Sequence, residues 1–295
     1  MTEPAGKLEQ LRDRIRNYGS CLIAYSGGVD SVFLAHVAHQ VLGPRAIAVI
    51  ADSPSLPRRE LEEALAIAKQ FRFPIRVVHT AEFDNSDYTA NPVNRCYFCK
   101  QELFEELTAI AREEGFATIA YGENASDASD IRPGAKAAAE FRICAPLKEA
   151  GLTKAEIRAL SAQLGLPTAE KPQMACLSSR VPHGEAVSLE KLRMIEAAEN
   201  VLRDLGFHDV RVRHHELGSA ERGMQNGNAL ADGIIQSVIQ NPKSAIVPAL
   251  ARIEVGPAEL PKFLADGTAG RVAGALKQIG YAHVTVDLQG YRRPA

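Results

Sequence analysis

The sequence predicts an α/β protein with a doubly wound parallel sheet and a second, smaller α+β domain. Short apolar runs of β type alternate with amphipathic helical stretches through the first half of the chain, which is typical of a parallel sheet covered on both faces. The prolines and the lack of periodicity at 168–184 indicate a domain junction. We therefore expect domains at 1–167 and 168–295, which suits a length of 295 residues.

The first domain is expected to alternate strands with helices. The expected strands are 21–25, 46–51, 75–79 and 117–121, with 141–145 as a candidate fifth strand. The expected helices are 30–42, 58–71, 100–114 and 154–164. Gly165 and Pro167 follow the last helix, as is usual at a helix end.

The second domain is expected to mix the two element types. Helices are predicted at 188–205 and 257–278, and strands at 209–213, 250–255 and 283–288. Between the first two strands lies an insertion at 218–247, rich in Gly, Asn, Ser and Ala. Stretches of this length are usually functional, oligomerising or disordered.

The composition of the chain bears on which kinds of partner it can bind. A net charge of −2 gives no sign of a surface for nucleic acid or an anionic membrane. No apolar run approaches the ~18 residues of a membrane span, and residues 1–11 are polar. We expect a cytoplasmic protein that binds neither nucleic acid nor membrane. Its five cysteines are too few for a disulfide framework and are available for chemistry or metal.

A glycine-rich loop follows the first strand and opens the first helix. It consists of Ser26, Gly27, Gly28, Val29, Asp30 and Ser31. Backbone N–H groups and a positive helix end suit a phosphate there, and adjacent glycines let the backbone approach it. Because the kinase-type lysine is missing, release of pyrophosphate from ATP is favoured over transfer of the γ-phosphate. Asp30 is either a helix cap or a ligand of the Mg²⁺ that accompanies ATP.

Three cysteines are candidates for chemistry. Cys176 lies between Lys171 and Arg180, and nearby cations raise the thiolate fraction that a nucleophile needs. Cys96 and Cys99 are spaced so that both sulfurs can reach one metal, but such a pair is half of a zinc site. With Cys176 they would give the three thiolates of a [4Fe–4S] cluster with one open iron. The alternatives are core roles for all three thiols.

Two arginines alternate on the expected strand at 209–213. Because side chains on a strand alternate between its faces, Arg211 and Arg213 should lie on the same face. Paired guanidinium groups suit bidentate binding of a phosphate or carboxylate. A solvated edge strand is the alternative.

The loop sequence SGGVDS resembles the signature of the PP-loop ATP pyrophosphatases, which include GMP, NAD and asparagine synthetases and tRNA thiolases. The resemblance implies the adenine nucleotide hydrolase-like fold, with ATP at the loop. It also implies that Asp52 lies near the adenosine and that Gly122 flanks the nucleotide. A simple turn after a strand is the alternative for Asp52.

Five further segments extend the resemblance over nearly the whole chain to one PP-loop family, the LarE family of nickel-pincer nucleotide synthesis. They are NRCYFCK, KPQMACLSSR, VRVRHHE, ARIEVGP and GYAHVTVDLQGYR. The resemblance implies that ATP adenylates a carboxylate of pyridinium-3,5-biscarboxylic acid mononucleotide and that a sulfur nucleophile then displaces AMP. It also implies a homo-oligomer, a hexamer in this family. The residues implied to hold the substrate are Ser179, Arg180, Arg211 and Arg213.

The family obtains its sulfur in two ways. In one branch the cysteine matching Cys176 forms a thioester and is left as dehydroalanine, and in the other three cysteines hold a [4Fe–4S] cluster that carries a transferable sulfide. Since Cys96, Cys99 and Cys176 are all present, the resemblance favours the cluster branch. A tRNA thiolase and a non-catalytic ATP-binding sensor are the alternative functions.

Overall fold

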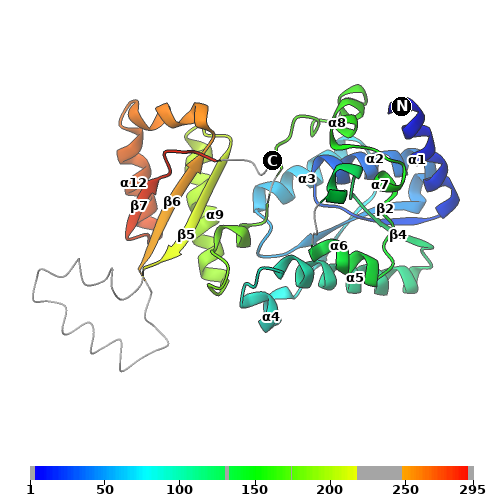
Figure 1. Ribbon diagram of the computed structural model, residues 1–295, viewed down its shortest axis with the longest axis horizontal. Coiled ribbons are helices and arrows are strands. Elements are labelled where there is room, and N and C mark those ends of the chain that lie inside the picture. The colour runs from blue at the N-terminus through cyan, green and yellow to red at the C-terminus, as the bar shows by residue number, and fades with distance from the viewer. Residues whose placement is uncertain (1–3, 130–132, 174, 218–247, 292–295) are drawn as a thin grey trace, which may run out of the picture. The chain divides into compact units, whose positions relative to one another are not determined.

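The chain divides into two compact units, Met1–Cys176 and Leu177–Ala295. The computed structural model, drawn in Figure 1, describes residues 4–129, 133–173, 175–217 and 248–291. The division comes later than the boundary expected after residue 167, because the Arg158 side chain donates hydrogen bonds to the carbonyl oxygens of Ala169 and Lys171. The insertion expected at 218–247 lies outside the described residues.

The first unit contains a four-stranded parallel sheet in the order β3-β2-β1-β4. Its strands are β1 (Cys21–Ala24), β2 (Ala46–Asp52), β3 (Ile75–His79) and β4 (Thr118–Tyr121). Its helices are α1 (Pro4–Tyr18), α2 (Val29–Leu42), α3 (Arg58–Gln70), α4 (Ser86–Thr89), α5 (Arg95–Glu114), α6 (Pro133–Glu140), α7 (Pro146–Glu149) and α8 (Lys154–Gln163). The parallel sheet with helices confirms the predicted α/β class.

Side chains of β1 alternate between two apolar cores. Cys21 and Ile23 pack with α1, α2, α3 and α8, whereas Leu22 and Ala24 pack with α5 and α6. Figure 1 shows the two groups of helices on opposite sides of the sheet. Because β1 lies between β2 and β4, the chain turns in opposite directions on its two sides, which is the usual ligand position in open α/β sheets.

Two predicted elements of the first unit differ in the structure. Helix α5 begins at Arg95, so it includes Cys96 and Cys99. The candidate fifth strand at 141–145 forms only an isolated bridge between Cys144 and Ala120. The left-handed backbone of Arg142 (φ 55°) and the start of α7 at Pro146 leave no room for a longer ladder.

The second unit packs helices against a three-stranded mixed sheet in the order β5-β6-β7. Strands β5 (Val210–Glu216) and β6 (Ala249–Val255) are antiparallel, and β6 is parallel to β7 (His283–Val286). The helices in its described residues are α9 (Leu189–Asp204), α12 (Thr268–Ile279) and the 3₁₀ segments η4 (Leu177–Arg180) and η6 (Pro257–Leu264).

The single helix expected at 257–278 is divided into η6 and α12. Pro261 lies inside η6, where it lacks an N–H for the helical pattern, and Gly267 adopts φ 68° before α12 begins. None of the helices in the described part of the chain combines the length and apolar character that crossing a membrane requires.

Candidate functional site

The glycine-rich loop connects β1 to α2 and is closed by the Ser31 hydroxyl. This oxygen accepts a hydrogen bond from the Ser26 backbone N–H at 3.1 Å and donates to the Gly28 carbonyl at 3.1 Å. Gly28 caps α2 without a side chain, so no side-chain cap occupies the positive end of the helix. The loop therefore has the backbone arrangement of an anion site at the carboxyl edge of the sheet.

Two glycines of this region have no room for a side chain. A Cβ on Gly27, whose φ is 71°, would lie 2.8 Å from the Cβ of Ala64 in α3. A Cβ on Gly122, after β4, would lie 3.0 Å from the Ser31 N atom and 3.1 Å from the Asp30 Cβ. The structure thus places Gly122 against the glycine-rich loop, and its contact with the nucleotide stays a prediction.

Asp30 forms an ion pair that the sequence analysis did not predict. Lys154, the first residue of α8, places its Nζ 2.6 Å from the Asp30 Oδ2. Burial raises the pKa of Asp30, and Lys154 opposes this shift. A half-buried carboxylate beside a cation and a phosphate-type loop can exchange partners when a charged ligand arrives.

Asp52, at the end of β2, is engaged within its own loop. Arg58 pairs with its carboxylate and also donates hydrogen bonds to the Ser53 and Leu56 carbonyl oxygens at 2.7 and 2.8 Å. The His79 Nδ1 lies 3.6 Å from Asp52 Oδ2. Asp52 therefore organises the turn after β2, and its contact with adenosine stays a prediction.

Cys96 and Cys99 lie in the first turns of α5, three residues apart and so on one side of the helix. Burial raises the pKa of the Cys99 thiol to about 12, and the charge of Cys176 contributes next. Protein around the Cys96 sulfur raises the pKa of that thiol too, although the residue is exposed, and Cys176 is again the second cause. The three sulfurs share one neighbourhood.

The side chains of Cys96, Cys99 and Cys176 are not arranged as the ligands of one metal site in the structure. Among the residues that the structure describes, no three His, Cys, Asp or Glu side chains are placed to hold a metal ion. The residues therefore do not fit the expected cluster in this arrangement.

A cation that the sequence analysis missed, Arg95, lies beside the Cys176 sulfur. Its side chain is buried, with 3% of the residue exposed, and its Nη2 lies 3.9 Å from the Cys176 Sγ. The same guanidinium pairs with the side chain of Asn91, a buried residue with the uncommon φ of 56°. Its position just before Cys96 in the NRCYFCK segment is the signal that could have identified it.

The two cations that the sequence places near Cys176 have other partners. The Lys171 Nζ lies 2.8 Å from Glu60 Oε2 and 3.0 Å from Glu63 Oε2 on α3. Arg180 lies in the second unit and is bound to Glu199. Arg95 therefore supplies a positive charge beside Cys176 that the sequence analysis did not name.

The predicted substrate residues of the second unit come together around η4 and β5. Ser179 accepts a hydrogen bond from Arg180 Nη1 at 3.0 Å, and its carbonyl oxygen accepts one from Arg213 Nη1 at 2.7 Å. Arg211 is buried, and its pKa is lowered by burial and then by the charge of Arg180. The Arg211 guanidinium also lies 4.6 Å from the ring centre of Tyr291.

The alternation expected on β5 is present. Val210 and Val212 lie in the apolar core of the second unit, so Arg211 and Arg213 lie on the other side of the sheet. Arg213 is bound there by Glu254 at 3.1 Å.

Glu199 of α9 connects this group and was not predicted. Its carboxylate accepts hydrogen bonds from Arg180 Nε at 2.8 Å, the Val212 backbone N–H at 3.1 Å and Arg203 Nη2 at 3.4 Å. It is completely buried. An acidic residue at the helical spacing of Ile195 and Leu202, both core residues, is the signal that identifies it.

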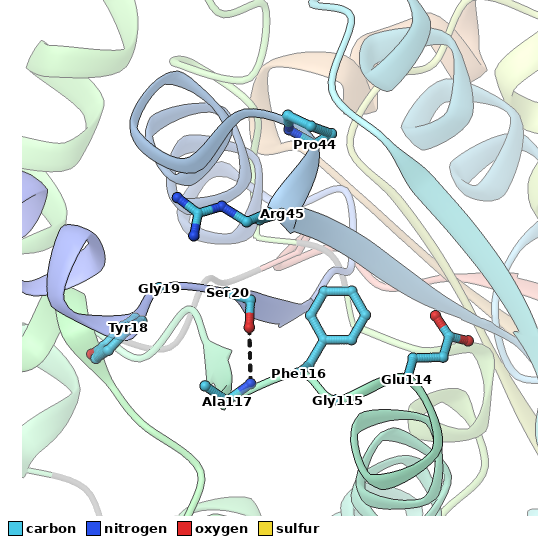
Figure 2. A pocket seen from close by; sticks show the side chains of 9 residues that line it. All are labelled: Tyr18, Gly19, Ser20, Pro44, Arg45, Glu114, Gly115, Phe116 and Ala117. Carbon is cyan, nitrogen blue, oxygen red and sulfur yellow. Dashed lines mark hydrogen bonds between the residues drawn. The ribbon is translucent and has the colours of Figure 1, made fainter.

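An open hollow lies at the opposite, amino-terminal edge of the first sheet and is shown in Figure 2. It is lined by residues just before β1, β2 and β4, and the Ser20 hydroxyl accepts a hydrogen bond there from the Ala117 N–H at 2.9 Å. Because ligands of open α/β sheets bind at the carboxyl edge, we assign the hollow no role.

Several known proteins are similar to this chain over most of its length. No protein-family model matches it. It is 41% identical over 286 residues to the uncharacterized protein slr1717 of Synechocystis sp., covering 97% of this chain and 95% of that protein. It is 29% identical over 294 residues to the pyridinium-3,5-bisthiocarboxylic acid mononucleotide synthase of Lactiplantibacillus plantarum, covering 99% and 94%.

A second group of relatives matches half of the chain. One subunit of the glutamine-hydrolyzing GMP synthase of Sulfurisphaera tokodaii is 27% identical over 165 residues, covering 50% of this chain and 44% of that protein. The partial match is consistent with a shared ATP-binding fold joined to different partner regions.

Proposed function

The chain belongs to the LarE family of PP-loop proteins, and on this premise we propose that it is an ATP-dependent sulfurtransferase that acts on pyridinium-3,5-biscarboxylic acid mononucleotide. The similarity to a mononucleotide synthase over 99% of the chain carries the proposal. The proximity of Arg95 to Cys176, in the same unit as the anion-type loop, supports it. A cytoplasmic homo-oligomer, hexameric by resemblance, is part of the proposal.

The first step is adenylation of a substrate carboxylate. We infer that the backbone N–H groups of the loop bind the phosphates of ATP and that Asp30 binds the accompanying Mg²⁺. The carboxylate oxygen attacks the α-phosphorus, and the bond to pyrophosphate breaks. Lys154, released from Asp30, would then offset negative charge on the phosphates.

The second step transfers sulfur. The Cys176 sulfur attacks the carbonyl carbon of the acyl-adenylate, so that a C–S bond forms, the bond to AMP breaks, and the thiol proton is lost to solvent. The Arg95 guanidinium, 3.9 Å from this sulfur, faces the negative charge that it carries during attack. Loss of the Cys176 Cα proton with cleavage of its C–S bond then releases the thiocarboxylate and leaves dehydroalanine.

The arginines of the second unit are proposed to hold the substrate. Arg211 and Arg213 lie on one side of β5 and would bind the phosphate of the mononucleotide, with Ser179 and Arg180 beside them. The Glu199 carboxylate fixes Arg180 through two of its nitrogens, so this group is held in place before the substrate arrives.

Replacement of single cysteines tests the proposal. The protein is incubated with ATP, Mg²⁺ and the biscarboxylic mononucleotide, and pyrophosphate, thiocarboxylate and protein mass are measured. Cys176→Ala should still release pyrophosphate but form no thiocarboxylate, whereas the matched Cys144→Ala should behave as the parent. Thiocarboxylate formed by Cys176→Ala would refute the role of Cys176.

The mass of the reacted protein separates the two sulfur sources. Loss of hydrogen sulfide from Cys176 indicates the sacrificial reaction. Iron, sulfide and visible absorption in protein purified without oxygen, together with repeated turnover, would instead assign the chain to the cluster branch, which the resemblance favours and the described side-chain arrangement does not fit. Salt-sensitive binding of tRNA would favour the thiolase alternative.

A further inference from the structure

Lys171 lies on the same segment as Cys176 and is tied to helix α3. Its ammonium is within 3.0 Å of both the Glu60 and the Glu63 carboxylates. The side chains of Lys171 and Glu60 are only 10% and 14% exposed, so this ion pair is largely withdrawn from water. Separating its two charges would leave each one poorly hydrated, which opposes detachment of the segment.

The turn of α3 that binds Lys171 also packs on the glycine-rich loop. Ala64, one turn after Glu60, lies so close to Gly27 that a Cβ there would be 2.8 Å from its own Cβ. The Tyr25 hydroxyl, immediately before the loop, donates a hydrogen bond to the Ala64 carbonyl at 3.0 Å. A displacement of this turn of α3 would therefore also displace the backbone of the glycine-rich loop.

Helix α8 holds the same segment from a second side and also reaches the loop. Arg158 donates hydrogen bonds to the Ala169 and Lys171 carbonyl oxygens, and Lys154 at the start of α8 pairs with Asp30. Residues 169–171 are thus bound by two helices, and each of these helices also contacts the loop.

We propose that Lys171 is a positioning residue that fixes the Cys176 segment relative to the nucleotide loop, so that sulfur rather than water meets the acyl-adenylate. This inference rests on the proposed function. Attack by water would return the carboxylate and AMP, whereas attack by Cys176 leads to thiocarboxylate. Both outcomes consume one ATP, so the ratio of thiocarboxylate to pyrophosphate measures the placement of the sulfur.

The test compares this ratio in three variants. Lys171→Met should keep pyrophosphate release while the ratio falls on the order of 10²-fold, the effect of about 1 Å of misplacement. Lys171→Arg should recover most of the ratio, because a guanidinium can also bind both carboxylates. The control is Lys191→Met, which breaks an ion pair of the second unit with Glu216, where the lysine side chain is 12% exposed, and should leave the ratio unchanged.

A parental ratio in folded Lys171→Met overturns the inference, as does an equal loss of pyrophosphate and thiocarboxylate. If Lys171→Met does not fold, Glu60→Gln, which removes the partner charge, should lower the ratio in the same direction, and an unchanged ratio counts against the inference.

A second measurement does not depend on the reaction. Alkylation of Cys176 by iodoacetamide, measured by mass spectrometry, should be faster in Lys171→Met than in the parent or Lys191→Met. If the parent forms neither pyrophosphate nor thiocarboxylate, the proposed function has failed, and the alkylation rates alone decide whether Lys171 holds the segment. Equal alkylation rates in all three proteins contradict the proposed role of Lys171.

Discussion

The two units place their central ion pairs in different surroundings. Arg180 and Glu199 of the second unit are each 0% exposed, whereas Lys154 and Asp30 at the loop are 33% and 19% exposed. A fully buried pair is stable only while both charges are present, because either one alone would lack hydration. A partly hydrated pair can exchange its partner for a ligand. The buried pair is therefore suited to hold the arginine group of the second unit in place. The more accessible pair is suited to exchange partners when a ligand reaches the loop.

The largest expected effect is the loss of Glu199. Glu199→Ala leaves the buried Arg180 charge without its carboxylate and should lower the free energy of unfolding by about 3–5 kcal/mol. Urea denaturation measures this change. Glu216→Ala, which breaks a more exposed pair with Lys191, should cost only about 0–1 kcal/mol. Equal costs would remove the contrast between buried and exposed pairs.

The second unit should also respond to pH through His214. Burial, followed by the charge of Lys191, lowers the pKa of His214 to about 4. Because the unfolded chain binds this proton below pH 6.5 and the folded chain only near pH 4, stability is lost as pH falls through that window. The free energy of unfolding should be about 3 kcal/mol lower at pH 4 than at neutral pH. His214→Asn should have a shallower pH dependence in denaturation, and an unchanged slope counts against burial as the cause.

At the loop, the sterically limiting position is Gly122. Gly122→Ala places a Cβ 3.0 Å from the Ser31 N atom and should cost about 1–3 kcal/mol in unfolding free energy while weakening ATP binding. Gly6→Ala, on α1 with open space around it, should be neutral or stabilise by up to about 1 kcal/mol. Thermal denaturation with and without ATP compares the two, and similar shifts would show that Gly122 is not a contact position.

The smallest effect on stability is expected at Lys154. Lys154→Met breaks a partly exposed pair and should change the free energy of unfolding by no more than about 1 kcal/mol. ATP binding should nevertheless weaken by ~10–100-fold, since a hydrogen bond to a charged group contributes about 1.5–3 kcal/mol. Calorimetric titration with ATP measures this, and unchanged affinity would mean that Lys154 does not turn toward the phosphates.

The sequence predicted those parts of the fold that local patterns determine. The four strands of the first sheet follow from apolar runs such as 46–51, and the loop after β1 from its own residues. Helix α5 was placed too late because Arg95 and Cys96 give no periodic signal before Lys100. The break between η6 and α12 depends on Gly267 and Pro261, which the amphipathic pattern of 257–278 concealed.

The partners of charged side chains were harder to predict. Lys171 precedes Cys176 in the sequence, yet it binds α3, and the guanidinium near the sulfur comes from Arg95. Pairings such as Asp30 with Lys154 join residues far apart in the chain, and tertiary packing, not sequence spacing, determines them. The resemblance implied that Ser179, Arg180 and Arg213 hold the substrate. The structure shows both arginines bonded to Ser179, and their contact with the substrate stays a prediction.

The division of the chain after Cys176 bears on how such an enzyme can diversify. The loop, Arg95 and the proposed nucleophile all belong to the segment that ends at Cys176, whereas the arginine group begins beyond it. Recombination at this point would transmit the proposed activation chemistry and the proposed sulfur donor together as one module. The specificity for the substrate that receives the sulfur could then change by exchange of the second unit alone, while the residues proposed to carry out the reaction stay unchanged.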